Sequence, residues 1–232
     1  MIIYNGIDLK GVAPVMIEDI HVSPIELSPT VRQRPIKIGA DYVRMTGGVR
    51  TIAINFALLT MNRDERARQL MDITKWARSN NPAPLVLPNY HDKYINCVCT
   101  ALPEPSTRQW WESKLRLVFT AYDPYFVSLS ERSVACGTAF STYGDAEPLV
   151  QIRRTLSSAA TNQTYSNGSE SMTFSTIPAG NLVIDLNKQT AAVNGTSIMQ
   201  YYPLTGASFL KPKLGQQTIS GTGTVYWRER WE

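Results

Sequence analysis

The sequence predicts a mainly β protein of the all-β or α+β class, and three observations support this prediction. Short runs with alternating apolar and polar residues recur along the chain, whereas only one stretch has the spacing of an amphipathic helix. Charged residues make up only 18% of the 232 residues, a composition that is typical of β-rich proteins. Asn-Gly pairs and prolines separate the runs, as in antiparallel sheets. The length allows one large domain or two domains of about 100 residues each.

The chain begins with a predicted β-hairpin, because Asn5-Gly6 in MIIYNGIDL lies between two apolar runs. Residues 31–58, VRQRPIKIGADYVRMTGGVRTIAINFAL, predict two further extended segments that form a hairpin joined around Gly47-Gly48. In the second of these segments one face is expected in the core and the other is expected to be lightly packed or wet. The core-facing residues are Ile52, Ile54, Phe56 and Leu58, and the opposite residues are Ala53, Asn55 and Ala57.

One helix is predicted, from about Asn62 to Asn80. Asn62 and Glu65 have the spacing of a capping box, and Pro82 follows the predicted end. Apolar or small residues recur at helical spacing and predict the buried stripe, with Leu70 and Met71 at its centre. The stripe consists of Ala67, Leu70, Met71, Thr74 and Ala77.

After two further strands, in PAPLVLP and DKYINCVCTAL, the stretch LRLVFTAYDPYF (115–126) predicts a half-buried strand that ends at Asp123-Pro124. The apolar positions of this strand alternate with the others at a period of two. Proline has no N–H for a sheet ladder and biases the preceding residue toward extended geometry, so the strand must stop there. We interpret this stop as the exit of the first domain. The residues expected on the buried face are Leu115, Leu117, Phe119 and Ala121.

The second half predicts an antiparallel β-sandwich. Residues 127–148 are rich in Ser, Gly and small residues and have the composition of a connection between domains. Short strands follow in LVQIRRTL, SMTFSTI, NLVIDL, TAAVNG and TVYW, with expected type I′ turns at Asn167-Gly168 and Asn194-Gly195. The predicted organisation is a domain over 1–130, a linker over 131–148 and a second domain over 149–232.

The sequence contains no recognisable catalytic, cofactor-binding or metal site, and we predict that the protein is not an enzyme. No G-x-S-x-G motif occurs, and the two histidines, His21 and His91, lack partners at metal-ligand spacing. Nothing in the sequence pairs the carboxylates that a glycosidase would need, and Gly221-Thr222-Gly223-Thr224 lacks the lysine of a phosphate-binding loop. The carboxylates considered are Glu104, Glu112 and Asp123.

The cysteines and tryptophans are expected to be structural. Three cysteines without C-x-x-C spacing make a disulfide framework improbable, and Cys97 and Cys99, two apart in one strand, are expected to be core thiols. Each of two Trp groupings has two interpretations. The first is a surface that contacts a sugar or a protein, and the second is structural, with one Trp in the core and the other over a strand end. The cysteines are Cys97, Cys99 and Cys136; the groupings are Trp110-Trp111, and Trp227 and Trp231 with Arg228 and Arg230.

No association with a membrane is expected, because no stretch approaches the ~20 apolar residues of a membrane span and the amino terminus lacks the pattern of a signal peptide. The formal charge of +4 is spread without a basic block, which does not favour a nucleic-acid reader.

Several stretches together resemble the distal tail protein family of siphophages, the bacteriophages with long non-contractile tails. The resemblance lies in the order and spacing of stretches over the whole chain, since each alone is an ordinary strand-and-turn pattern. The segment DYVRMTGG departs from the more Gly-rich form of the family. The stretches are IIYNGIDL, residues 31–58, the helix with Trp76, PLVLPNYHDKYINC, LRLVFTAYDPYF, GDAEPLVQIRRTL, STIPAGNLVIDLNKQTAAVNG and FLKPKLGQQTISGTG.

The resemblance implies an N-terminal β-sandwich-like domain with one α-helix and a β-hairpin, which forms a hexameric ring, and a C-terminal galectin-like antiparallel β-sandwich. It implies a virion structural protein at the distal end of the tail, assembled in the host cytoplasm. The implied partners are further copies of the chain in a homo-hexamer, the major tail tube protein, a tail-associated or tail-fibre protein and a receptor-binding protein. DNA would pass through the channel without specific binding. The alternative function is that of a carbohydrate-binding β-sandwich for host cell-wall saccharides.

Overall fold

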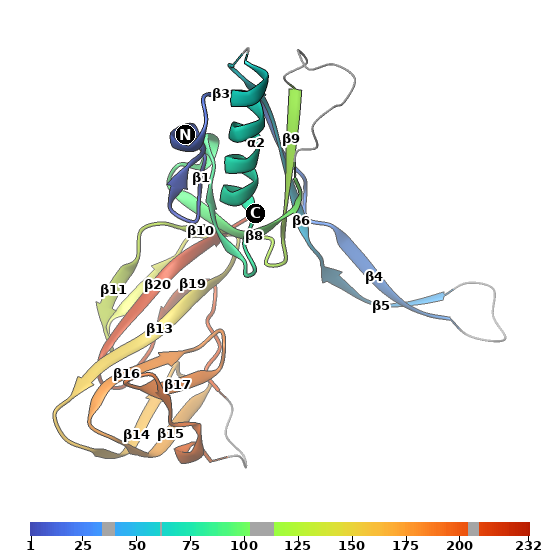
Figure 1. Cartoon of the computed structure of the whole chain (residues 1–232). Coiled ribbons are helices and arrows are strands. Elements are labelled where there is room, and N and C mark those ends of the chain that lie inside the picture. Colours follow the sequence, from blue (N-terminus) through green and yellow to red (C-terminus); the bar gives the residue numbers. More distant parts are fainter. Residues whose placement is uncertain (34–39, 61, 103–113, 204–208) are drawn as a thin grey trace. The chain divides into compact units, whose positions relative to one another are not determined.

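In the computed structural model the chain forms two compact units, which are described separately (Figure 1). The first unit is Met1–Phe126 together with Glu232, and the second is Val127–Trp231. The structure describes residues 1–33, 40–60, 62–102, 114–203 and 209–232, and for β4 and β5 it describes the backbone alone.

The first unit is built on antiparallel strands in the order β2-β1-β7-β8-β9-β6-β3. The first part of β8 pairs with β7 and its last part pairs with β9, with a register shift between Cys99 and Ala101. The shift lies within the β8–β9 pairing, and a bulge of this kind bends the strand locally. The strands are β1 (Ile3–Tyr4), β2 (Ile7–Asp8), β3 (Val15–Val22), β6 (Arg50–Leu58), β7 (Ala83–Val86), β8 (Lys93–Ala101) and β9 (Lys114–Ala121).

Strands β4 (Leu27–Gln33) and β5 (Ala40–Gly47) form a separate two-stranded antiparallel sheet. The prediction of a hairpin around Gly47-Gly48 was wrong, because β5 pairs with β4 whereas β6 pairs with β3 and β9. Gly48 instead closes the base of the β4–β5 hairpin: its N–H donates to the Glu26 carbonyl at 2.7 Å. A Cβ at this position would lie only 2.7 Å from the same oxygen, so a side chain there would displace the backbone.

Helix α2 (Arg63–Ala77) begins where the sequence predicts and ends earlier than Asn80. The Asn62 side chain accepts hydrogen bonds from the N–H groups of Asp64 and Glu65, which satisfies two donors of the first turn. The prediction of its buried face was wrong for Met71, which is 63% exposed, and for Leu70, which is only half-buried, whereas Ala77 is buried as predicted. The buried residues are Gln69, Ile73, Trp76 and Ala77.

An aromatic cluster joins three elements of the first unit. Tyr4 of β1, Trp76 of α2 and Phe119 of β9 lie with ring centroids 5.0 to 6.3 Å apart, in edge-on and tilted contacts. The polar atoms of two of these rings are also used: Tyr4 donates to the Cys97 carbonyl at 3.1 Å, and Trp76 donates to the Ile7 carbonyl at 2.9 Å. Trp76 therefore determines which face of α2 meets the sheet.

The core faces predicted for β6 and β9 are confirmed. Every expected core residue is buried: Ile52, Ile54, Phe56, Leu58, Leu115, Leu117, Phe119 and Ala121. The prediction of a lightly packed or wet opposite face of β6 was wrong for Ala53 and Ala57, which are 2% and 5% exposed, while Asn55 is half-buried. Ala53 lies between His21 of β3 and Val118 of β9, so the larger neighbours on both sides shield this small side chain.

The second unit has an antiparallel sheet in the order β11-β20-β13-β16-β17-β18, and two separate strand pairs, β12–β19 and β14–β15. Buried side chains from the sheet and from both pairs form one hydrophobic core. The strands are β10 (Phe126–Ser128), which spans the division, β11 (Arg132–Ala135), β12 (Ala139–Thr142), β13 (Ala146–Leu156), β14 (Ala160–Ser166), β15 (Ser171–Ile177), β16 (Gly180–Asp185), β17 (Thr190–Val193), β18 (Thr196–Ser197), β19 (Gly215–Thr218) and β20 (Thr224–Trp231).

The segment 131–148, expected to be a linker, contains β11, β12 and the beginning of β13. Its small residues belong to strands of the second unit rather than to a free connection. The division lies at Phe126–Val127, close to the Asp-Pro stop. Further elements absent from the prediction are the short helix α1 (Leu9–Val12) and the 3-10 turns η1 (Pro88–Tyr90) and η2 (Met199–Tyr201).

Two of the three Asn-Gly pairs form two-residue turns. Asn5-Gly6 and Asn194-Gly195 both have positive φ and connect strands whose last and first residues pair directly. At the third pair, Ser166 pairs with Ser171, so the loop has four residues and the type I′ prediction was wrong. Its Asn167 accepts from the N–H groups of Ser169 and Glu170 through the side chain, which stabilises a longer turn.

Candidate functional site

The residues considered for catalysis from the sequence lie apart. His21 is exposed on β3 and His91 is exposed after η1. Asp123 is exposed just beyond the end of β9. Within the part of the chain that the structure describes, no three His, Cys, Asp or Glu side chains group as a metal site would require. Glu104, Glu112, Trp110 and Trp111 lie outside the described residues.

The three cysteines are free thiols. Cys97 is fully buried, and its burial raises the pKa of the thiol. Cys99 is partly buried, and burial raises its pKa to about 11, although hydrogen bonding to backbone carbonyls opposes the shift. Reactive thiols need a lowered pKa, so this environment suits packing rather than nucleophilic chemistry.

The tryptophans of β20 agree with the structural interpretation, in which one lies in the core and the other at a strand end. Trp227 is 7% exposed and its ring lies 4.6 Å from Phe140 in the core of the second unit. Trp231, at the end of the strand, is partly exposed, and its Nε1 donates to the Ser128 hydroxyl at 3.4 Å. The Gly221–Thr224 stretch is a turn that leads into β20, with Gly221 and Gly223 at positive φ.

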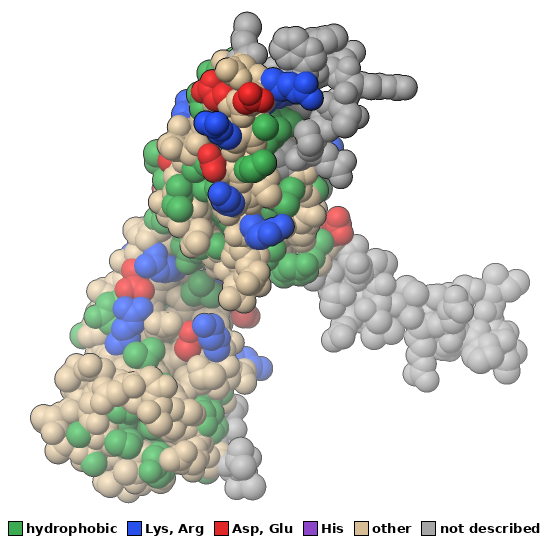
Figure 2. Space-filling view, viewed as in Figure 1, with side chains coloured by type: hydrophobic (Ala, Val, Ile, Leu, Met, Phe, Trp, Pro, Cys, Tyr) green, Lys and Arg blue, Asp and Glu red, His purple; other side chains and the backbone are tan. Residues whose placement is uncertain are grey.

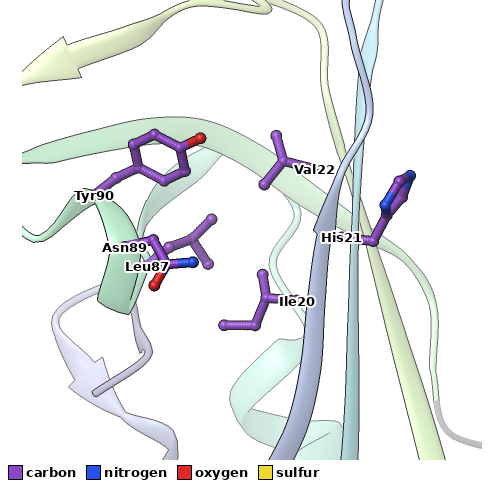
Figure 3. Close-up of a pocket in the computed structure, with 6 residues that line it drawn as sticks. All are labelled: Ile20, His21, Val22, Leu87, Asn89 and Tyr90. Atoms are coloured by element: carbon purple, nitrogen blue, oxygen red, sulfur yellow. The ribbon is translucent and has the colours of Figure 1, made fainter.

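The first unit has a depression of about 260 Å³ beside the end of β3, lined by both apolar and polar side chains (Figure 3). Ile20 and Val22 point toward Leu87, Asn89 and Tyr90 across it, whereas His21 points to the other side of the strand. This arrangement follows from the period of two along β3. Of the strands that the structure describes, β3 pairs only with β6, so the depression lies along a sheet edge.

A buried arginine lies close to this depression. Arg50 is 5% exposed, its guanidinium carbon lies 5.4 Å from the centre of the Phe126 ring, and Tyr90 stacks on the same ring at 4.5 Å. Burial lowers the pKa of Arg50, while the nearby Glu232 acts in the opposite direction. The stack fixes Tyr90 as a wall of the depression, which is therefore pre-formed.

The second unit carries a polar network on the outward side of its sheet. Arg153 makes two hydrogen bonds to Glu131, at 2.8 and 2.9 Å, and two to Gln151, and its guanidinium lies 4.3 Å from the Tyr226 ring centre. Gln151 donates in turn to Asp185 of β16 at 3.0 Å. Side chains held in this way lose little conformational freedom when a partner binds, so the network is a candidate contact surface.

A second depression, of about 520 Å³, is lined by hydroxyl, amide and backbone groups of the β14–β15 turn and β19. Much of the hydrogen-bonding capacity of its lining is already used. Ser166 donates to Glu170 and accepts from Gly168, and Gln217 bonds both the N–H and the carbonyl of Lys213. A saccharide would have few free groups to bind there.

Neither the protein-family models nor the curated proteins contain a match to this sequence. Among solved structures, the chain is similar to the crystal structure of the SPP1 Dit protein, described as a paradigm of the hub adsorption apparatus in phages that infect Gram-positive bacteria. The TM-score is 0.78 at 15% identity, and the match covers 100% of this chain and 98% of that chain. The phage P2 baseplate in its activated conformation matches at a TM-score of 0.47 and 9% identity, over 94% of this chain and 90% of that chain. The chain therefore has the fold of SPP1 Dit.

Proposed function

We propose that this protein is the structural hub at the distal tip of a long non-contractile phage tail. The observation that supports the proposal is the fold likeness to SPP1 Dit, which extends over nearly the whole of both chains. A likeness of this extent includes both units and leaves almost no part of either chain unmatched. The proposal assigns contacts rather than catalysis to the chain.

In this proposal six copies form a closed ring through the first unit, and the second unit is a galectin-like domain outside the ring. The ring joins the major tail tube protein to a tail-associated or tail-fibre protein, a receptor-binding protein is a further partner, and DNA passes through the central channel. Head-to-tail contacts that close on themselves generate such rings. We assign the ring-forming part to Met1–Phe126 and the outer part to Val127–Trp231.

Light scattering of the purified chain tests the ring. The expected particle has a mass of about 155 kDa, six times the 25.9 kDa of one chain, and electron microscopy should resolve a central channel. A monodisperse monomer at every protein and salt concentration tested would contradict the proposal.

The second candidate is binding of host cell-wall saccharides by the second unit. The polar depression between the β14–β15 turn and β19 favours it, because hydroxyl and amide groups recognise sugars. It ranks second because internal hydrogen bonds occupy much of that lining. A glycan array with the parent protein and Gln216→Ala tests it. Binding that this change abolishes would support the candidate, and no binding on the array would remove it.

A further inference from the structure

The first unit exposes two surfaces of opposite charge, each with a solvent-exposed methionine. The first, the helix surface, is the outward side of α2 around Met71, which is 63% exposed. Figure 2 shows charged side chains gathered over this helix. With its C-cap residue the helix carries five basic and three acidic side chains, a net +2. The basic residues are Arg63, Arg66, Arg68, Lys75 and Arg78, and the acidic residues are Asp64, Glu65 and Asp72.

The second, the edge surface, is the segment 16–26, which comprises β3 from its second residue onward and the four residues that follow it. It contains three acidic residues, Glu18, Asp19 and Glu26, all exposed, and no lysine or arginine. Met16 on the same segment is 52% exposed. Two apolar walls of the depression, Ile20 and Val22, belong to this segment as well.

The two surfaces match in size and chemistry. A 15-residue helix is about 22 Å long and an 8-residue strand is about 26 Å long, so the elements can lie along one another. Net positive charge on one surface and net negative charge on the other favour an oriented encounter and disfavour like-with-like pairing. Methionine is flexible and polarisable and adapts to irregular surfaces, so Met71 has the properties to contact the aliphatic side chains of Ile20 and Val22 in the depression.

We propose that the helix surface of one copy binds the edge surface of the next copy, head to tail. Because the two surfaces differ, the contact is heterologous, which is the type that closes into rings. The inference rests on the proposed ring and specifies which surfaces form it.

Paired charge reversal in the full chain tests this contact. The first variant, Arg68→Glu with Lys75→Glu, makes the helix surface acidic. The second variant, Asp19→Lys with Glu26→Lys, makes the edge surface basic. Each variant alone should form particles with fewer chains than the parent, because like charges then face one another. A 1:1 mixture should recover the parent mass, since the two variants can alternate around a six-membered ring with every contact complementary.

The control is Lys188→Glu, an exposed reversal in the second unit, which should assemble like the parent. Melting temperatures near that of the parent would show that the variants fold. Single variants that assemble normally would overturn the inference, and so would a mixture that stays dissociated while both variants are folded. Neither result would contradict the proposed ring of the parent protein. A parent that is monomeric under all conditions would overturn both this inference and the proposed function.

Discussion

Glu229 shows how a charged residue is accommodated in the core of the second unit. It is 4% exposed, and its carboxylate accepts from the N–H groups of Tyr143 and Gly144 and from the indole of Trp227, at 3.0 to 3.2 Å. A buried carboxylate is costly unless hydrogen bonds replace its water. The bonds to Tyr143 and Gly144 connect β20 to the loop that follows β12. The buried carboxylate therefore has a structural role, which is to hold this loop in place.

The first prediction concerns Glu229→Gln. The amide has one acceptor oxygen and two donors, so it cannot accept all three hydrogen bonds, and at least one buried N–H loses its partner. Leaving such a group unsatisfied costs about 1–3 kcal/mol of unfolding free energy. Urea unfolding measures the loss, with Glu147→Gln at an exposed position of β13 as the control. Equal midpoints for the Glu229 variant and the parent would contradict the assigned role.

The second prediction concerns Gly144 in the same loop. A Cβ built there would lie 2.2 Å from the Arg230 carbonyl oxygen, which is a backbone atom. Because Asp145 N–H already bonds that oxygen at 2.8 Å, the strand cannot move away without losing the bond. Gly144→Ala should therefore destabilise the second unit by about 1–3 kcal/mol, the usual cost of overpacking.

Gly11→Ala is the matched control, because no atom lies within 4 Å of a Cβ built at that position. Thermal unfolding followed by circular dichroism compares the two variants. A Gly144 variant as stable as the Gly11 variant would show that the loop has room that the structure does not indicate.

The sequence could have predicted that Arg50 and Glu229 are buried, although not what they contact. Arg50 is in phase with Ile52 and Ile54, and Glu229 is in phase with Val225 and Trp227, so each continues a buried face. Their partners lie far away in the sequence, and Tyr143, for example, is 86 positions from Glu229. Contacts at this separation depend on the fold and leave no local pattern.

At the scale of elements, α2 shows why periodicity alone was insufficient. The helix has two candidate stripes: one through Leu70 and Met71, which the sequence favoured, and one through Gln69, Ile73 and Trp76, which is buried. The buried stripe contains a glutamine, so the spacing of apolar residues alone did not identify it. Packing of Trp76 against Tyr4 and Phe119 makes the second stripe the buried one.

The third prediction tests this assignment. Ile73 is fully buried, so Ile73→Asp should place an unpaired charge in the core and prevent folding of the first unit. Met71→Asp introduces the same side chain two residues away at a 63% exposed position, so the single chain should still fold even though the proposed contact between copies would weaken. Melting temperature and soluble yield distinguish the two variants. Failure of both variants to fold would mean that Met71 packs within its own chain.

Most strands were predicted, because the alternation of apolar and polar residues is a local signal. The pairing between strands was not predicted. The alternation in β9 and β15 is visible within each strand, and both lie where the sequence predicts. Strand β14 was missed because its sequence, ATNQTYS, is polar and only Tyr165 is buried. The β4–β5 pairing was missed because the Gly47-Gly48 signal suggested the wrong turn.

At the scale of the whole molecule, charge is the property that the proposed function constrains most directly. The net charge of +4 is small for 232 residues, and acidic residues are interspersed among the basic ones. A ring that lets DNA pass must not hold it tightly, so a weakly charged chain suits the proposal. Specific recognition would instead require basic groups concentrated where they can reach base edges.

The fourth prediction follows from this charge distribution: the protein should bind duplex DNA only weakly and without sequence preference. Binding that depends on a few phosphate contacts releases counterions and falls steeply with salt, with a logarithmic slope of about −0.9 per contact. Fluorescence anisotropy with two duplexes of equal composition and different sequence measures both properties over a series of salt concentrations. The two affinities should be equal and should vanish near physiological salt. A preference for one duplex that persists at that salt would mean that the chain reads DNA, and a passive channel would then no longer describe its role.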